Sequence, residues 1–155
     1  MAQLREGEFA PDFDLPSDDG RSISLASLKG KPVVLYFYPK ADTSGCTKEA
    51  QDFNSLLVDF RKLNCAVLGV SADPVNALAK FKSKYGLAFP LVGDESHTTL
   101  EDYGVWVQKS MYGRSYVGVE RSTFLLDRAG RIVKLWRKVK VDGHAKEVLA
   151  AASKA

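Results

Sequence analysis

Residues 33–46 read VVLYFYPKADTSGC, and this stretch decides the fold. Its first six residues, Val33–Tyr38, are β-branched, aliphatic or aromatic without a break, which is typical of a central strand covered on both faces. Pro39 ends the run, because proline cannot donate to a strand ladder. A short loop then leads into an amphipathic pattern over Thr47–Leu63, where apolar side chains recur at helical spacing. The stretch therefore predicts a buried strand, a loop and a helix, with Cys46 at the start of that helix.

The rest of the chain alternates strand and helix patterns around this core. A second buried-strand pattern, Ala66–Ser71, precedes a helix that Pro74 starts and Gly86 stops. This order predicts an α/β chain of the thioredoxin-like fold, a central mixed β-sheet flanked by helices, with an N-terminal β-hairpin extension. The remaining expected elements are a strand at Phe89–Val92, a short helix at Thr98–Tyr103, a hairpin of Thr123–Leu126 and Ile132–Trp136, a closing helix at Ala145–Ser153, and an N-terminal hairpin of Phe13–Leu15 and Ser22–Leu25.

Length and composition exclude several classes of protein. The 155 residues fit one domain of ordinary size, so we expect a single domain over residues 1–155. With 45% apolar and 26% charged residues, the chain does not belong to the disordered or fibrous classes. A net charge of +3 is too small to indicate a nucleic-acid partner. No apolar run approaches the roughly 20 residues of a membrane helix, and residues 1–15 lack the apolar block of a signal peptide, which together favour a cytoplasmic protein.

Cysteine and histidine are too few for a disulfide framework or a metal centre. The chain has two cysteines, Cys46 and Cys65, and two histidines, His97 and His144. None of them has the C-x-x-C or H-x-x-x-H spacing of a zinc site, so we expect no metal and no cofactor. Both histidines lie in polar or loop-like sequence, which predicts surface positions. Each cysteine must therefore be considered separately, either as a residue that packs in the core or as a reactive thiol.

The position of Cys46 favours a reactive role for its thiol. Backbone N–H groups in the first turn of a helix lack carbonyl partners and the helix dipole is positive there, so a thiolate is stabilised. Gly45 keeps bulk away from the sulfur, and Thr43 is near enough in sequence for its hydroxyl to bond the thiolate or a ligand. The alternative is a small buried cysteine that starts the helix.

Two other cysteine chemistries are disfavoured. A dithiol reductase needs C-x-x-C, but position 43 is threonine and position 49 is glutamate. A papain-like hydrolase needs a histidine paired with Cys46, and neither histidine lies in a context that suggests it.

Several segments together resemble the peroxiredoxin family. Pro39, Thr43 and Cys46 form the arrangement P-x-x-x-T-x-x-C, which is similar to the peroxiredoxin active-site loop, most of all in the bacterioferritin comigratory protein (PrxQ) subfamily. The similarity spans nearly the whole chain. The further matching segments are Ala10–Phe13, Leu68–Ser71, Phe89–Leu91, Glu120–Leu125, Trp136–Val139 and Gly143–His144.

The resemblance implies an antioxidant peroxidase that reduces hydrogen peroxide and organic hydroperoxides while a cysteine becomes sulfenic acid. By position, the peroxidatic cysteine corresponds to Cys46, the hydroxyl that bonds the peroxide to Thr43, the residue shielding the sulfur to Pro39, and the active-site arginine to Arg121.

Two charged residues have a functional and a plain interpretation. Arg121 begins an apolar strand pattern, where a charge is costly unless it is paired or functional, so it belongs either to the site or to an ion pair with Glu120. Glu49 either orients Arg121 or another group, or lies on the helix surface. The fixed guanidinium would stabilise charge on the departing peroxide oxygen.

The resolving thiol of related proteins is missing. Its family positions correspond to Gln51 and to Lys82 or Ser83, none of which carries sulfur. Cys65 lies beyond the far end of the helix, about 25 Å away at ~1.5 Å per residue, so an intramolecular disulfide is disfavoured. We therefore expect a one-cysteine mechanism in which thioredoxin, glutaredoxin or glutathione reduces the sulfenic acid. The resemblance also implies a monomer or homodimer.

Two other functions fit the same scaffold. One is a noncatalytic binding or holdase protein, which a missing resolving thiol favours weakly, but retention of Thr43, Cys46 and Arg121 argues against it. The other is a redox relay that oxidises a partner protein. Ser44 replaces the proline usual in this motif, which predicts a looser loop.

Overall fold

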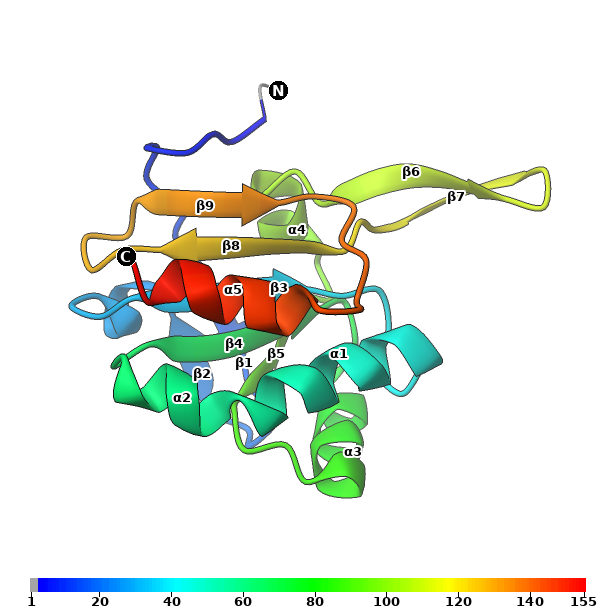
Figure 1. Ribbon diagram of the computed structural model, residues 1–155. Coiled ribbons are helices and arrows are strands. Elements are labelled where there is room, and N and C mark those ends of the chain that lie inside the picture. The colour runs from blue at the N-terminus through cyan, green and yellow to red at the C-terminus, as the bar shows by residue number, and fades with distance from the viewer. Residues whose placement is uncertain (1–2) are drawn as a thin grey trace.

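The computed structural model describes residues 3–155, and its centre is a five-stranded mixed β-sheet with helices on both faces (Figure 1). The strand order is β5-β4-β3-β8-β9. Strand β3 lies in the middle, parallel to β4 and antiparallel to β8. This is the expected central mixed sheet. Its strands are β3 (Val33–Phe37), β4 (Ala66–Ser71), β5 (Leu91–Gly93), β8 (Ser122–Leu126) and β9 (Ile132–Trp136).

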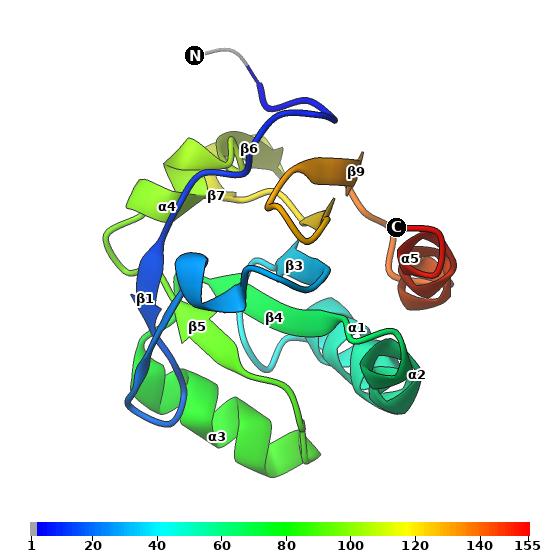
Figure 2. The same ribbon diagram turned by 90° about the vertical axis from the view of Figure 1, so that its left-hand side faces the viewer.

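The side chains of the central strand alternate between two hydrophobic clusters, one on each face of the sheet. Val34 and Tyr36 belong to the cluster formed with the helices α1 (Ser44–Ser55), α2 (Leu57–Lys62), α3 (Val75–Tyr85) and α5 (His144–Ala152). Leu35 and Phe37 belong to the other cluster, with β1 (Asp14–Pro16) and α4 (Thr98–Asp102). Figure 2 shows α5 with α1 and α2 on one side of the sheet and β1 with α4 on the other. Burial on both faces explains the unbroken apolar run of β3.

The long helix expected over Thr47–Leu63 is two helices, which corrects the prediction. Helix α1 starts earlier, at Ser44, and ends at Ser55, and α2 starts at Leu57. Leu56 lies between them with φ −101° and ψ 5°, outside the helical range. The apolar spacing continues through the break, since Leu57 and Phe60 are buried in the same cluster as α1, so the pattern gives no sign of it.

A third hairpin was not expected from the sequence. Strands β6 (Trp106–Met111) and β7 (Arg114–Val119) pair antiparallel in a separate two-stranded sheet. They project away from the central sheet in Figure 1. The predicted N-terminal hairpin is present as β1 and β2 (Ser22–Ser24), followed by the short 3-10 helix η1 (Ala26–Leu28).

The sheet brings together two segments far apart in sequence. Phe37 of β3 pairs with Ser122 of β8, so the residue before β8, Arg121, lies beside the point where the chain leaves β3 for α1. Of the helices within residues 3–155, none has both the length and the apolar character needed to span a bilayer.

Candidate active site

Cys46 is the third residue of α1 and lies in the first turn of that helix. Thr43 is the N-cap residue, and its carbonyl accepts a hydrogen bond from the Thr47 N–H at 2.8 Å. The N–H groups of the first helical residues have no carbonyl partners within the helix, as the sequence suggested. The Cys46 side chain is only 1% exposed, so it packs into the core as well as lying at a helix N-terminus.

The sulfur of Cys46 faces a guanidinium group. Arg121 Nη2 is 3.4 Å from Cys46 Sγ, and Arg121 Nη1 donates a hydrogen bond to Glu49 Oε1 at 2.7 Å. Glu49 is one helical turn after Cys46, so both side chains project from the same face of α1. Arg121 pairs with Glu49 and makes no ion pair with Glu120 in the part of the chain that the structure describes. The three side chains therefore form one contiguous cluster, Cys46–Arg121–Glu49.

Burial governs the electrostatics of this cluster. The Glu49 side chain is 1% exposed, and burial raises its pKa to about 7 against the opposing effect of Arg121. Burial would lower the pKa of Arg121, but the charges of Glu49 and Cys46 outweigh it and raise the pKa. The guanidinium is consequently a permanent cation beside the sulfur. Glu49 Oε2 is buried and has no hydrogen-bond partner among residues 3–155.

Gly45 leaves room for that cation. A Cβ atom at this position would lie 3.2 Å from Arg121 Nη2, which is tighter than ordinary van der Waals contact. The expectation that Gly45 keeps bulk away from the Cys46 sulfur stays a prediction.

Thr43 and Pro39 lie on the loop before α1. The Thr43 hydroxyl is exposed and donates to the Lys40 carbonyl at 2.8 Å, and no hydrogen bond joins it to Cys46. Pro39 is half-buried and follows β3. The roles of Thr43 in binding the peroxide and of Pro39 in shielding the sulfur stay predictions.

Two aspartates that the sequence analysis did not single out hold this loop. Asp73 Oδ2 accepts hydrogen bonds from the Ala41 N–H and from the Ser71 hydroxyl, both at 2.8 Å. Asp42, in the left-handed region with φ 61°, accepts hydrogen bonds from Lys84 Nζ at 3.0 Å and from the Tyr85 hydroxyl at 2.5 Å. A polar residue two positions after the end of the buried strand β4 was the available signal for Asp73.

The surface position expected for His144 is wrong. Its side chain is 4% exposed, lies edge-on to Phe53 and Trp136, and shares a hydrogen bond of 2.8 Å with Thr123 Oγ1. Burial lowers the pKa of His144 to about 4, so the ring is neutral at physiological pH. The aromatic residues that cover it come from α1 and β9, which the local sequence around position 144 does not show.

Neither histidine takes part in the cysteine cluster. His97 is half-buried and stacks on Trp106, with ring centroids 3.9 Å apart. Within residues 3–155, no hydrogen bond joins a histidine to Cys46, and no three His, Cys, Asp or Glu side chains gather as a metal site would require.

The residues that the sequence analysis considered for a resolving thiol lie at four places in the fold. Gln51 and Ser83 are exposed on α1 and α3, and Lys82 forms an ion pair with Asp18. Cys65 precedes β4, is 4% exposed and is a free thiol. Burial raises the pKa of Cys65 to about 12, so it carries no thiolate at neutral pH.

The chain is similar to known proteins over most of its length. The AhpC/TSA family model matches residues 7–135. Peroxiredoxin Bcp of Bacillus subtilis is 47% identical over 143 residues, covering 92% of this chain and 91% of that protein.

Solved structures have the same fold. A structure of the Xanthomonas campestris bacterioferritin comigratory protein, studied for alkyl peroxide reduction, has a TM-score of 0.88 at 45% identity and covers 92% of this chain and 90% of that chain. A structure of a cysteine-to-serine mutant of Xylella fastidiosa PrxQ has a TM-score of 0.94 at 37% identity. It covers 99% of this chain and 98% of that chain. The expected thioredoxin-like peroxiredoxin fold is thereby confirmed.

Proposed function

Because the chain belongs to the AhpC/TSA family and is a thiol peroxidase like its Bcp relatives, we propose that Cys46 is its peroxidatic cysteine. The observation that carries this assignment is the 3.4 Å contact between Cys46 Sγ and Arg121 Nη2 at the start of α1. Hydrogen peroxide and alkyl hydroperoxides are the proposed substrates. The noncatalytic alternative is not favoured by relatives that are named peroxiredoxins.

The proposed reaction is a two-electron displacement at oxygen. The Cys46 thiolate attacks the distal oxygen of the peroxide, an S–O bond forms and the O–O bond breaks. The departing oxygen takes a proton and leaves as water or an alcohol. Sulfur is oxidised to sulfenic acid and the peroxide is reduced.

Arg121 is proposed to stabilise the transition state. Negative charge grows on the departing oxygen as the O–O bond breaks, and a fixed cation stabilises that charge more in the transition state than in the ground state. Glu49 holds the guanidinium in place at 2.7 Å. Because the Arg121 side chain is 16% exposed while Cys46 is 1% exposed, we place peroxide entry along the guanidinium, beside Gly45 and Thr43.

Regeneration is proposed to use an external thiol. That thiol attacks the Cys46 sulfenic sulfur and releases water, and a second thiol cleaves the resulting mixed disulfide to restore the Cys46 thiolate. Gln51, Lys82 and Ser83 supply no sulfur, and Cys65 is buried with a pKa of about 12. These features support a one-cysteine mechanism with thioredoxin, glutaredoxin or glutathione as reductant.

A peroxide-consumption assay with dithiothreitol tests the assignment. Cys46→Ser should abolish turnover, and Arg121→Ala should lower kcat/KM by about 100-fold or more, because a preorganised donor to the developing charge is lost. Cys65→Ser is the matched control and should keep wild-type activity. Wild-type rates in the Cys46 and Arg121 variants would refute the peroxidase site.

Mass spectrometry tests the one-cysteine part separately. One equivalent of peroxide, without reductant, should add one oxygen atom to the peptide that contains Cys46. A stable disulfide between Cys46 and Cys65 would overturn the external-thiol mechanism while leaving the peroxidatic assignment intact.

A further inference from the structure

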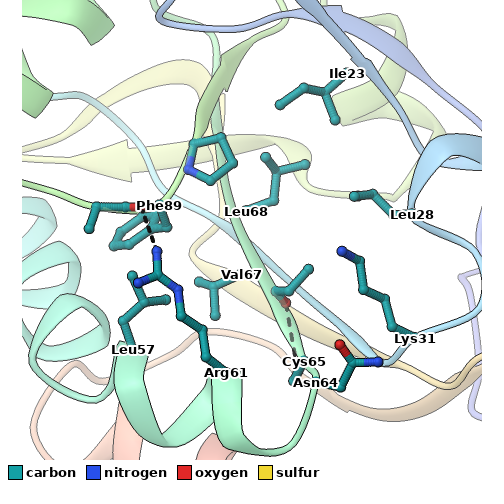
Figure 3. Close-up of a pocket in the computed structure, with 13 residues that line it drawn as sticks. Ile23, Leu28, Lys31, Leu57, Arg61, Asn64, Cys65, Val67, Leu68 and Phe89 are labelled. Carbon is teal, nitrogen blue, oxygen red and sulfur yellow. Dashed lines mark hydrogen bonds between the residues drawn. The ribbon is translucent and has the colours of Figure 1, made fainter.

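A cavity lies at the opposite end of the sheet from Cys46. It has a volume of about 280 Å³ and is open to solvent beside the first residues of β4 (Figure 3). Strands β3 and β4 are parallel, with Val33 opposite Ala66, so the cavity adjoins their N-terminal ends, whereas Cys46 follows the C-terminal end of β3. The two places are therefore separated by the length of the central strand, and the cavity has no part in the peroxidase chemistry.

The walls of this cavity are mostly hydrocarbon. Leu57 comes from α2, Ile23 from β2 and Leu28 from η1, while Val67 and Leu68 of β4 lie between them in Figure 3. A partly enclosed apolar hollow of this size fits a small molecule with a hydrocarbon body. The other apolar lining residues are Cys65, Ala66, Ala88, Phe89 and Pro90.

The polar groups that line the cavity include two cations and no carboxylate. Lys31, Arg61 and Asn64 are the only lining residues with charged or amide side chains. Arg61 Nη2 donates to the Ala88 carbonyl at 3.3 Å. Within residues 3–155, neither Lys31 nor Arg61 forms an ion pair, so both positive charges are available to a ligand.

Lys31 is placed to receive an anion. Its ammonium group extends toward Leu28 at the rim in Figure 3, and Asn64 lies beside the base of its side chain. Arg61 lies across β4 from it and adds positive potential from the other side. The cavity thus offers an apolar floor with a cation and an amide donor at its edge.

We propose that this cavity binds a medium-chain carboxylate, with the hydrocarbon chain against Leu28 and Leu68 and the carboxylate on Lys31. Desolvating an alkyl chain supplies affinity, and a charge-assisted hydrogen bond from Lys31 supplies orientation.

Calorimetric titration with decanoate, below its micelle concentration, tests the proposal. The wild-type protein should bind decanoate, and Lys31→Gln should weaken binding about tenfold, the equivalent of one charge-assisted bond. Lys29→Gln is the matched control, because Lys29 lies two residues away, changes the net charge equally and does not line the cavity. Decanol, which lacks the charge, should bind the wild type more weakly than decanoate.

Variants of the apolar wall locate the ligand. Leu28→Ala shortens the wall on which the alkyl chain is proposed to lie and should weaken decanoate binding severalfold, whereas Val58→Ala, at an exposed residue outside the cavity, should leave it unchanged. Lys31→Gln in the otherwise wild-type chain should keep wild-type peroxidase activity, which would show that this variant is folded. Equal weakening by Lys29→Gln, equal binding of decanol, or unchanged binding in Leu28→Ala would each overturn the proposal.

Discussion

Arg121 Nη1 donates a hydrogen bond to Glu49 Oε1 at 2.7 Å, joining the residue before β8 to a helix 72 positions earlier in the chain. The same guanidinium reaches Cys46 Sγ with its other terminal nitrogen, at 3.4 Å. A planar fork suits this double contact, because two nitrogens are held in fixed geometry. The orientation of the cation at the sulfur therefore depends on a carboxylate that does not itself touch the sulfur.

The first prediction concerns this coupling. Arg121→Lys should lower kcat/KM by about 100-fold, because a single ammonium cannot contact both partners. Glu49→Gln should lower it about tenfold, because the amide keeps an acceptor oxygen but loses its charge. The double variant should be no slower than Arg121→Lys, since Glu49 acts through Arg121. Multiplicative losses in steady-state assays would show that the two residues act independently.

The second prediction concerns the anchor of the active-site loop. Asp73→Ala removes the acceptor for the Ala41 N–H and the Ser71 hydroxyl, so the loop before α1 should loosen. We expect a fall in kcat/KM of several-fold and a loss of about 1–3 kcal/mol of unfolding free energy. Urea titration and peroxide assays measure the two effects. Asp59→Ala, at an exposed position on α2, is the control and should change neither.

The third prediction concerns the two thiols. In the folded protein, Ellman's reagent should modify Cys46 and leave Cys65 unreacted, because burial raises the pKa of Cys65 to about 12. In denaturant both thiols should react. Two thiols reacting at similar rates in the native protein would contradict the burial of Cys65, and Cys46→Ser identifies which thiol is counted.

The fourth prediction concerns acid stability. Burial lowers the pKa of His144 from 6.5 to about 4, so protons bind the unfolded chain more readily than the folded one between these values. The stability from neutral His144 is full above pH 6.5 and is lost as the pH falls toward 4, by about 3 kcal/mol at most. Unfolding curves should show a difference between wild type and His144→Gln that changes only in this window. A difference independent of pH would exclude His144 as the titrating group.

Most of the sheet could be predicted because its signals are local. The run Val33–Tyr38 is apolar throughout because β3 is covered on both faces, and Pro74 and Gly86 flank α3 as the capping preferences require. The hairpin of β6 and β7 was missed for an equally local reason. Its turn has positive φ at both Tyr112 and Gly113, and tyrosine stands where asparagine is the usual signal.

The candidate site could be predicted only in part. Cys46 was identified from its place at a strand-to-helix junction. Arg121 was identified from the resemblance to peroxiredoxins, which the cost of a charge at the start of an apolar strand supported. The contact of Arg121 with Glu49 was one of two interpretations, since a charge on a helix is usually solvated. Asp73 and His144 depend on segments far away in sequence, and no local pattern shows what a residue meets across the fold.

The interruption at Leu56 limits how far melting of the catalytic helix can spread. Helical turns unfold cooperatively, and the regular α-helix is interrupted at Leu56, whose N–H donates to the Phe53 carbonyl at 3.2 Å. Opening that begins beside Cys46 can free the sulfur for a bulky protein thiol without unwinding α2, whose Leu57 and Phe60 stay in the core. In the proposed mechanism, such a local opening would expose the oxidised Cys46 while α2 keeps its place in the core.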